Sequence, residues 1–532
     1  MKKLVTAILV VTAMAFQAES NVLPRPNDIV LESNFDTLSE REAWSKANFA
    51  KWVTGYNGTT SLYIHVPSGL ARNGNMIQLP FDLTQYRGCR LLFECMAKAD
   101  NVSEPEAEYL GVKFMLYYES AKEGSFWGNE NHVYGTFDWR KLRFTKKIAA
   151  DATNGKIDLG LQGSSGTVWF DTIKITVIKP PMPSRPKPPI NPQPAFKGHN
   201  LPRLRGVMSP NVFHNDDMKM LGAGWKANVI RWQITRNWSH RDTDRDLAEY
   251  DSWIDDRLAE LDKVLESCRQ YGIKVVVDLH SPPGGRYANN DMAIFYEAEY
   301  QDYFVALWEK IARRYKGNPM IWGYDLINEP IQNKPPPEGL ADYLDTQVRT
   351  AKAIRAIDTE VPVFIEAAKA DSPEGFLELE PVDISNVIYE VHIYVPSEFT
   401  HQGVHRKWMP TEYPGKISNV EWNKEQLRRV LQPVREFQLA YNVHIYVGEF
   451  SAIRWAPGAA NYLRDCIELF EEYGWDWTYH AYREYDGWSV EYGSDPMDHS
   501  PAKTITDRKA LLLNWFGKNV KPGNMIKRTK IE

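Results

Sequence analysis

The sequence predicts a multidomain protein, with an N-terminal β-sandwich of the jelly-roll kind followed by a (β/α)8 barrel. The chain has 532 residues, too many for one ordinary domain. Eight prolines within residues 179–196 interrupt it. Before them short β-rich runs follow one another, and after them strand-like runs alternate with helical patterns. We therefore expect a sandwich over 21–178, a linker over 179–196 and a barrel over 197–532.

Residues 1–20 have the layout of a secretory signal peptide. A short basic start, Met1-Lys2-Lys3, precedes an apolar stretch from Leu4 to Phe16, and Ala13-Met14-Ala15 offers a cleavage site. The alternative interpretation is a buried N-terminal helix. No other run of about 18 apolar residues occurs, so we expect no membrane span. The mature protein should be exported, either secreted or periplasmic.

The balance of charge argues against a nucleic-acid partner. The chain carries 63 basic and 69 acidic residues, a formal net charge of −6, and its basic residues form no block beyond scattered pairs. The four cysteines lack the spacing of a zinc site, so we expect buried free thiols. The sequence does not predict the oligomeric state.

The sequence of the first domain predicts an all-β fold. Its strand-like runs recur between turn signals, and no long helical period interrupts them. The predicted strands cover 61–66, 89–96, 112–118, 142–144, 156–161 and 167–177. The proline-rich segment that follows favours an extended polyproline II conformation and predicts a semi-rigid spacer.

The run from Gly166 to Ile175 resembles the last strand of the β-sandwich carbohydrate-binding modules. That resemblance implies that Asp171, together with Glu32, holds a structural calcium, since carboxylate oxygens suit this ion. The alternative is that both are solvated acids at strand ends. Several aromatic residues are candidates for a sugar platform, with the sandwich core as the alternative: Trp127, Trp139, Tyr134, Tyr117 and Tyr118.

The second domain alternates strand and helix, as a (β/α)8 barrel with long loops does. Eight strands are predicted, over 204–208, 227–233, 274–279, 321–327, 361–365, 387–394, 443–447 and 475–482. Helical patterns lie between several of them, over 253–271, 297–314, 340–357, 424–439 and 459–473. Barrel active sites form at the C-terminal ends of the strands, so each polar residue that ends an apolar run is a site candidate.

Polar residues follow nearly every predicted strand, and two glutamates stand out. Glu329 closes the run Ile321 to Ile327, and Glu449 closes the run Val443 to Val447. The other strand-end candidates are Arg231, Asp278, His280, Asn328, Glu366, His392 and Tyr394. A single strand-end glutamate has a plain structural explanation, such as an ion pair at the barrel rim. Many polar residues converging on one face indicate a catalytic site.

These residues resemble those of the clan A glycoside hydrolases, and of family 5 in particular. The Asn328-Glu329-Pro330 motif carries the resemblance, together with Glu449 120 residues later. It implies that Glu329 is the general acid/base and Glu449 the nucleophile of a retaining hydrolase, with the two carboxyl groups about 5 to 5.5 Å apart. It implies supporting roles for Arg231, Asn328, His280, His392 and Tyr394. No metal or organic cofactor is required.

One position departs from the family pattern. The family usually places a tryptophan after the eighth strand as the floor of the sugar site, and His480 occupies that position. Either Trp488 or Trp477 is then expected to stack on the sugar, and Glu484 adds charge nearby. A polar floor favours a decorated glycan, or cutting at chain ends.

The leading interpretation is a retaining glycanase that acts on a β-1,4-glucan or a related polysaccharide or oligosaccharide. An exo-acting β-glycosidase, a mannanase and a xyloglucanase are alternatives with the same chemistry. A non-catalytic glycan-binding barrel is an alternative of another class, but both glutamates and Arg231 are present. A metal-dependent hydrolase would need paired histidines at strand ends, which the sequence lacks.

Overall fold

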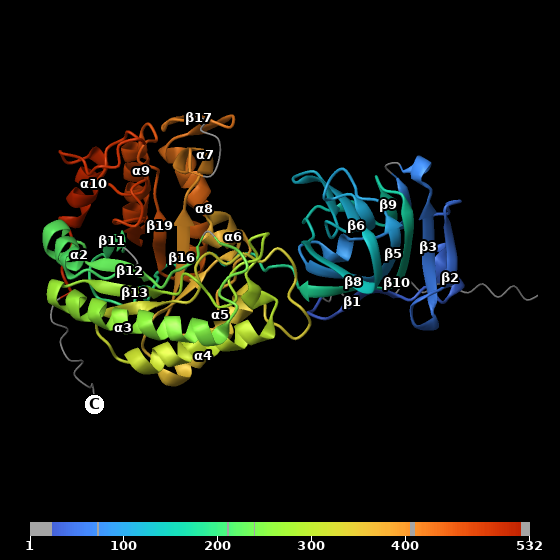
Figure 1. Ribbon diagram of the computed structural model, residues 1–532, viewed down its shortest axis with the longest axis horizontal. Coiled ribbons are helices and arrows are strands. Elements are labelled where there is room, and N and C mark those ends of the chain that lie inside the picture. The colour runs from blue at the N-terminus through green and yellow to red at the C-terminus, as the bar shows by residue number, and fades with distance from the viewer. Residues whose placement is uncertain (1–23, 72–73, 210–211, 239, 405–409, 523–532) are drawn as a thin grey trace, which may run out of the picture. The chain divides into compact units, whose positions relative to one another are not determined.

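The computed structural model describes residues 24–71, 74–209, 212–238, 240–404 and 410–522. The predicted signal peptide lies outside these residues. The chain divides into two compact units, with the boundary between Pro183 and Ser184. Two antiparallel sheets form the first unit and a closed eight-stranded parallel barrel forms the second, so the predicted fold classes are confirmed (Figure 1).

The first unit holds one six-stranded and one four-stranded sheet. The larger sheet has the order β2-β3-β10-β5-β8, with β1 also paired to β10, and the smaller has the order β4-β9-β6-β7. The strands are β1 (Ile29–Ser33), β2 (Ala50–Thr54), β3 (Thr60–Val66), β4 (Asn75–Pro80), β5 (Arg90–Val102), β6 (Gly111–Ser120), β7 (Gly124–Gly128), β8 (Gly135–Lys147), β9 (Thr153–Gln162) and β10 (Gly166–Lys179). A short helix, α1 (Leu38–Glu42), follows β1.

The core of this unit lies between its two sheets. Along β5 buried and half-buried residues alternate, as expected when one face of a strand meets the core. Phe93 of β5 stacks on Phe144 of β8 with ring centroids 4.6 Å apart. Tyr118 is fully buried in this core, whereas Trp127 is 61% exposed. All four cysteines are buried and free, as predicted.

The proline-rich segment contains no helix or strand after Lys179, the last residue of β10. From Ser184 onward its polar groups bond to the barrel. The Arg185 guanidinium donates to the Pro433 carbonyl at 2.8 Å, and Asn442 donates to the Gln193 carbonyl at 2.7 Å. The Trp322 indole inside the barrel donates to the Lys197 carbonyl at 2.9 Å. This part of the segment is therefore fixed along the barrel.

Each of the eight predicted barrel strands forms. They are β11 (Arg205–Met208), β12 (Val229–Gln233), β13 (Lys274–Asp278), β14 (Ile321–Asp325), β15 (Val363–Glu366), β16 (Val387–Ile393), β19 (Ile445–Phe450) and β20 (Asp476–Tyr479). They close in that order, with β20 paired to β11. A short hairpin, β17 (Gly415–Ile417) and β18 (Val420–Trp422), belongs to the loop after β16.

The five predicted helices also form, and their ends follow local chemistry. Helix α3 begins where the Asp246 side chain accepts from two backbone N–H groups, and it ends at Gly272, which adopts the left-handed conformation. The five are α3 (Leu247–Tyr271), α4 (Ala298–Tyr315), α5 (Tyr343–Ile357), α8 (Lys424–Tyr441) and α9 (Ala459–Tyr473). Four helices of this unit were not predicted, the short α2 (Asn215–Lys219), α6 (Ala368–Asp371) and α7 (Ser397–Thr400), and also α10 (Asp507–Phe516). Among the described residues, no helix is long and apolar enough to cross a membrane.

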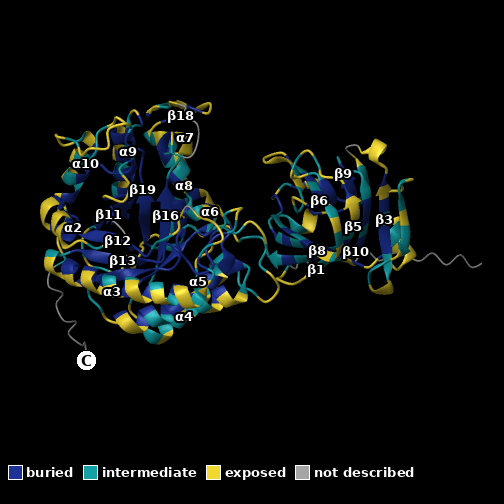
Figure 2. Ribbon diagram, in the orientation of Figure 1, coloured by how far each residue is buried: buried dark blue, intermediate teal, exposed yellow. Residues whose placement is uncertain are grey.

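Alternate residues of the barrel strands point inward and form two layers. Figure 2 shows the strands as buried and places exposed residues on helices α3 and α4. The lower layer is apolar and consists of Leu204, Val229, Val276, Trp322, Phe364, Ile388 and Tyr446. Two residues further along, four of these strands carry polar residues, namely Arg231, Asp278, Glu366 and Glu390, and register shifts place Asp325 and Glu449 three residues beyond Trp322 and Tyr446. The same alternation that builds the core therefore delivers polar side chains to the C-terminal end of the barrel.

Candidate active site

Arg231 is the centre of the polar layer. Its guanidinium is fully buried and donates to Asp325 from two nitrogens, at 2.8 and 2.6 Å. It also lies 3.2 Å from a carboxylate oxygen of Asp278 and 3.2 Å from one of Glu390. The planar fork of an arginine can bond several carboxylates at once, which a lysine cannot do. Arg231 therefore holds side chains from several strands in one arrangement.

The acids around Arg231 are buried close to one another, which raises their pKa values. Burial raises the pKa of Asp325 well above its ordinary value, and the nearby Glu390 adds to the shift. Burial also raises the pKa of Glu366, with a further contribution from Asp371. Arg231 acts in the opposite direction on Asp325, because a positive charge beside a carboxyl lowers its pKa.

Glu449, near the end of β19, is one of these acids. Its Oε1 accepts from Arg231 at 2.6 Å, and its Oε2 accepts from the Tyr394 hydroxyl at 2.7 Å. Burial alone would raise the pKa of Glu449, but His392, His480 and Arg231 outweigh it and hold that pKa far below its usual range. Glu449 is therefore ionised, the state in which a carboxylate can attack as a nucleophile.

The glycine before Glu449 is needed for this arrangement. A Cβ at Gly448 would lie 1.6 Å from Oε1 of Glu390 and 3.1 Å from Nε2 of His392. Any other residue at this position would displace Glu390 or the strand itself. Gly448 thus allows Glu390 of β16 and Glu449 of β19 to lie on neighbouring strands without a clash.

Glu329 reaches the same space from the loop after β14. Its backbone has a φ of 51°, a conformation that non-glycine residues seldom adopt. Its N–H donates to Oε2 of Glu366 at 2.6 Å, and its carbonyl accepts from Arg286 at 3.0 Å. These bonds hold the residue in its unusual conformation and leave its carboxylate 20% exposed at the barrel mouth.

His392 lies between the two glutamates. Its Nδ1 is 3.2 Å from Oε1 of Glu329 and 3.9 Å from Oε2 of Glu449. One oxygen of each glutamate and one His392 nitrogen all lie within 4.8 Å of one another. Burial would lower the pKa of His392, but Glu449 and the other carboxylates raise it well above the ordinary value. The three side chains have the spacing of metal ligands, and a metal ion here would displace the proton that the neighbouring carboxylates favour on His392.

Asn328 and His280 complete the polar wall. The Asn328 carbonyl oxygen accepts from Arg231 at 3.0 Å, while its buried Nδ2 has no hydrogen-bond partner among the described residues. A buried donor without a partner is costly unless a ligand satisfies it. His280 bonds through Nδ1 to Asp278 at 2.8 Å. Asn328 can therefore donate to a substrate, and Asp278 orients His280.

His480 and Glu484 form a charged pair on the opposite wall. Nε2 of His480 lies 3.2 Å from Oε2 of Glu484, which also accepts from Gln233 at 2.9 Å. Burial opposes a charge on His480, but Glu484, Glu449 and Glu329 raise the pKa of this histidine. The predicted departure from an apolar floor is therefore present as an ion pair.

The structure distinguishes the two candidate tryptophans. The Trp488 ring centroid lies 5.6 Å from that of His480 and 6.4 Å from that of Tyr394, so Trp488 borders the site. Trp477 does not reach it, and the prediction that it binds substrate is wrong. Its indole is fully buried, donates to Glu471 at 2.9 Å and stacks on Phe516 of α10. Residue 477 is at an outward position of β20, so its side chain points to the helices.

All the other predicted barrel-site residues lie at the C-terminal end of the strands. The structure brings together Glu329, Glu449, Arg231, Asn328, His280, His392, Tyr394, His480, Glu484 and Trp488. Their catalytic roles remain predictions. Two further residues lie at the site. The sequence indicates Arg286 as part of a rigid loop after the third strand, placed to shape one subsite, whereas Trp238 was missed. Arg286 donates to the carbonyls of both Asn328 and Glu329 at 3.0 Å, and Trp238, 47% exposed, lies 4.8 Å from the His280 ring. Both lie in loops, where no periodicity marks a residue.

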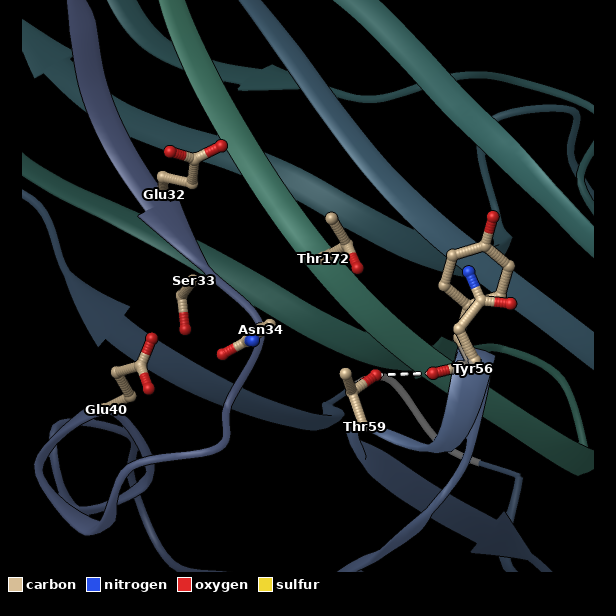
Figure 3. A pocket seen from close by; sticks show the side chains of 8 residues that line it. Glu32, Ser33, Asn34, Glu40, Tyr56, Thr59 and Thr172 are labelled. Atoms are coloured by element: carbon tan, nitrogen blue, oxygen red, sulfur yellow. Dashed lines mark hydrogen bonds between the residues drawn. The ribbon is translucent and has the colours of Figure 1, made fainter.

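A separate pocket occurs in the first unit, around the residues for which calcium was predicted (Figure 3). Glu32, Ser33 and Asn34 line it from the end of β1, with Thr172 from β10. Asp171 is fully buried, and its oxygens accept from Ser61, Thr59 and Thr172. Asp171 would have to lose these bonds to ligate an ion, whereas the oxygens that line the pocket suit one.

Comparison with known proteins identifies relatives of the second unit. The family model described as Cellulase (glycosyl hydrolase family 5) matches residues 191–486, which include all eight barrel strands. Endoglucanase C of Acetivibrio thermocellus is 28% identical over 271 residues, 45% of this chain and 76% of that protein. Cellodextrinase A of Ruminococcus flavefaciens is 27% identical over 248 residues, 46% of this chain and 70% of that protein. A solved hyperthermophilic endo-β-1,4-glucanase in complex with substrate has 20% identity and a TM-score of 0.48, over 60% of this chain and 100% of that one.

Proposed function

This chain belongs to glycosyl hydrolase family 5 and is an O-glycosyl hydrolase, and from that premise we propose that it cleaves β-1,4-linked glucan internally with retention of configuration. The names of its relatives, endoglucanase C and cellodextrinase A, support a β-glucan substrate. The position of the two glutamates supports the retaining mechanism. The ionised state of Glu449 and the position of Glu329 at the barrel mouth indicate which glutamate performs each step.

One observation carries the proposal. An oxygen of Glu329 and an oxygen of Glu449 lie within 4.8 Å of each other, on either side of His392. Inverting enzymes place a water between sugar and base and need carboxyl groups about 6.5 to 9.5 Å apart. Retaining enzymes need only about 5 to 5.5 Å, because the nucleophile attacks the sugar directly. The short separation favours double displacement.

In the first step Glu449 attacks the anomeric carbon while Glu329 donates a proton to the glycosidic oxygen. The bond to the leaving sugar breaks, and a covalent glycosyl–Glu449 ester forms. Arg231 and Tyr394 keep the attacking carboxylate ionised and oriented through their bonds to its two oxygens. Asn328 offers its unpartnered N–H to the sugar 2-hydroxyl, a contact that strengthens in the transition state.

In the second step a water replaces the departed sugar. Glu329, now deprotonated, takes a proton from this water, which attacks the anomeric carbon and releases Glu449 as a carboxylate. Atoms and charge balance, because the proton that Glu329 gave to the leaving group returns from water. His392 bonds to Glu329 in its anionic state and stabilises it between the steps. None of these steps requires a metal or an organic cofactor, and unchanged activity in the presence of a chelator would check this.

A second candidate is an exo-acting β-glycosidase, or a mannanase or xyloglucanase, with the same chemistry. The observation that favours it is the His480–Glu484 pair, which presents hydrogen-bonding groups where a flat apolar ring would stack on glucose. Such a wall suits a sugar with an axial hydroxyl or a substituent on that face. Product lengths and substrate preference separate the candidates.

The test is a panel of β-glucans, mannan, xylan and xyloglucan, with wild type compared with Glu449→Ala and Glu329→Ala. We expect wild type to release sugars with the anomeric configuration retained, and both variants to lose more than about a thousandfold in rate. Glu299→Ala, in the first turn of α4, is the matched control and should match wild type. Full activity of either site variant would contradict the assignment, as would inverted product. Binding without cleavage by wild type would favour a glycan-binding protein.

Three proposals concern the first unit and the N-terminus. We propose export of the protein. The mass of the mature protein, which shows at which residue its N-terminus begins, would test this.

We propose a structural calcium in the pocket lined by Glu32, and a fall in melting temperature on addition of a chelator would support it. We also propose glycan binding at Trp127, which is exposed and whose ring lies 5.4 Å from that of Tyr117. Weaker retention of Trp127→Ala on insoluble glucan would support it.

A further inference from the structure

Arg454 is a buried cation that no step of the proposed mechanism uses. It lies in the loop after β19, five residues beyond Glu449, and its side chain is 0% exposed. A buried charge is costly unless hydrogen bonds replace the water that it has lost. The partners of Arg454 therefore show what this charge does.

The loop after β20 surrounds the Arg454 guanidinium with oxygen atoms. Nη1 donates to the Gly493 carbonyl at 2.7 Å, and Nη2 donates to the Asp498 carbonyl at 3.0 Å. Oxygens of this loop lie within 3.4 Å of the two terminal nitrogens, namely those of the Asp486 carboxylate and of the carbonyls of Gly493, Asp495, Pro496 and Asp498. One side chain thus gathers the loop over residues 486–498.

Arg454 fastens the chain on both sides of Trp488. Its backbone N–H donates to the Gly487 carbonyl at 2.9 Å, directly before the tryptophan, and its guanidinium holds residues 493–498 after it. At Gly487 the two loops approach so closely that a Cβ would lie 2.8 Å from Cδ1 of Ile453. The Trp488 segment therefore cannot move away from the loop after β19 without breaking these bonds.

The segment held in this way forms one wall of the site. The Trp488 ring centroid lies 5.6 Å from that of His480 and 6.4 Å from that of Tyr394. Glu484, in the same loop, lies 3.2 Å from Nε2 of His480. Tyr394 in turn donates to Glu449 at 2.7 Å. A displacement of the loop therefore changes where this wall meets a sugar that Glu449 attacks.

The loop after β16 is joined to the same framework. The Ile453 N–H donates to the Thr400 carbonyl at 2.9 Å, and the Thr400 hydroxyl donates to the Tyr394 carbonyl at 2.7 Å. Residues 453 and 454 thus bond to the loops that follow the two strands beside β19. The positions of Tyr394 and Trp488 are therefore both tied to the strand that carries the nucleophile.

Arginine suits this position because its donors are numerous and fixed in direction. A guanidinium presents five N–H groups in a planar fork, whereas lysine has one nitrogen on a flexible stem. The four carbonyls and the Asp486 carboxylate offer more acceptors than the three N–H groups of an ammonium can bond. Removal of the Arg454 side chain leaves a space lined by these oxygens, which suits a free guanidinium ion.

We propose that Arg454 is a positioning residue that holds Trp488 and Glu484 against the strand of the nucleophile and thereby sets the affinity of the site for the sugar that Glu449 attacks. The inference rests on the proposed function, because it assumes that this sugar contacts the Trp488 wall. Arg454 itself touches neither the substrate nor the reacting atoms. It acts through the loop after β20.

The experiment measures kcat and KM on cellopentaose for wild type, Arg454→Ala and Arg454→Lys. Each protein is assayed without addition, with guanidinium chloride far below denaturing concentrations, and with sodium chloride at the same ionic strength. Arg205→Ala is the matched control. Arg205 is also buried, 8% exposed and bonded to Glu471 at 2.6 and 2.8 Å, but it is the first residue of β11, at the opposite end of the barrel.

We expect Arg454→Ala to raise KM about tenfold while kcat stays within about threefold of wild type, because the catalytic glutamates keep their partners. Guanidinium should restore KM, sodium chloride should not, and Arg454→Lys should lie between Arg454→Ala and wild type. Arg205→Ala should lower the melting temperature alone, which is the result expected of a merely structural arginine. An unchanged KM for Arg454→Ala, a rise that guanidinium leaves unchanged, or an equal rise for Arg205→Ala would overturn the inference.

Limited proteolysis gives a second readout that needs no substrate. Chymotrypsin should cut after Tyr492 sooner in Arg454→Ala than in wild type, and guanidinium should slow the cut, because the bond to Gly493 no longer holds this segment. Equal rates would contradict the role of Arg454 in holding the loop. If wild type cleaved no β-glucan, the proposed function would fail, and the rate of proteolysis would still decide whether Arg454 holds the loop.

Arg454→Lys keeps the test decisive if Arg454→Ala does not fold. It retains the positive charge and loses most of the donors. A raised KM and faster proteolysis of Arg454→Lys would support the inference, and wild-type values of both would overturn it.

Discussion

Replacing Tyr394 with phenylalanine tests how the nucleophile is held. The hydroxyl of Tyr394 donates to Oε2 of Glu449 at 2.7 Å, and phenylalanine removes it without changing the ring. Burial and the charge of Glu449 raise the pKa of Tyr394 well above its ordinary value, so the hydroxyl keeps its proton as a donor. A hydrogen bond to a charged group contributes about 1.5 to 3 kcal/mol. We therefore expect kcat/KM to fall roughly ten- to a hundredfold.

The same change should appear in the pH profile. The hydroxyl stabilises the ionised form of Glu449, so its loss raises the pKa of this carboxyl. At 1.36 kcal/mol per pH unit, the acidic limb of kcat/KM should move to higher pH by about one to two units. The assay is hydrolysis of 4-nitrophenyl β-cellobioside by wild type and Tyr394→Phe over the acid and neutral range.

Tyr324→Phe is the matched control for this prediction. Tyr324 is also fully buried on a barrel strand, but its hydroxyl has no hydrogen-bond partner among the described residues. Its removal should leave activity and pH profile unchanged. If Tyr394→Phe also stayed within twofold of wild type with an unmoved acidic limb, Tyr394 would not support Glu449, and the reasoning would be refuted.

Three other predictions follow from single contacts. Asn328→Ala should lower kcat/KM about a hundredfold on a β-glucoside but little on its 2-deoxy analogue, because the lost N–H donates to the 2-hydroxyl. Equal losses on both substrates would contradict this role. Trp488→Ala should raise KM, because Trp488 borders the site. Trp477→Phe should lower only the melting temperature, since Trp477 packs against α10. A change in KM for Trp477→Phe would instead place residue 477 in the substrate site. Asp476 accepts from His199 and His444, bonds that outweigh burial and hold its pKa far below the ordinary value. The stabilising effect of ionised Asp476 is therefore complete above about pH 4 and is lost on further acidification. Asp476→Asn should lower the free energy of unfolding by about 3 kcal/mol at neutral pH. Urea titrations should show that the difference between Asp476→Asn and wild type becomes smaller in acid.

Much of the fold could be predicted because the strands carry their own signals. Runs such as 274–279 and 321–327 are mainly apolar, which is typical of strands buried on both faces. In the sandwich, the short strands β1, β2, β4 and β7 were missed, since five or six residues with exposed positions carry little periodicity. The helix α10 follows the eighth strand, where a (β/α)8 barrel calls for a helix, but it is only ten residues long and is separated from that strand by 27 residues, so its pattern was missed.

The sequence alone determined which residues stand at the ends of the barrel strands. Glu329 and Glu449 each follow an apolar run, and the period of two along a strand places Arg231 and His392 on its inner face. These are local relations, carried by neighbouring residues of the chain. The structure brings all four side chains together at the C-terminal end of the barrel.

Only the tertiary structure decided what each group meets across the barrel. It made Arg231 the common partner of carboxylates from several strands, directed Trp477 outward, and paired His480 with Glu484. It also placed the loop after β13 against the loop that follows Glu329, through the bonds of Asp291 to Asn333. Such relations depend on strand register and on loop conformations. They join residues far apart in the chain, so no local pattern can encode them.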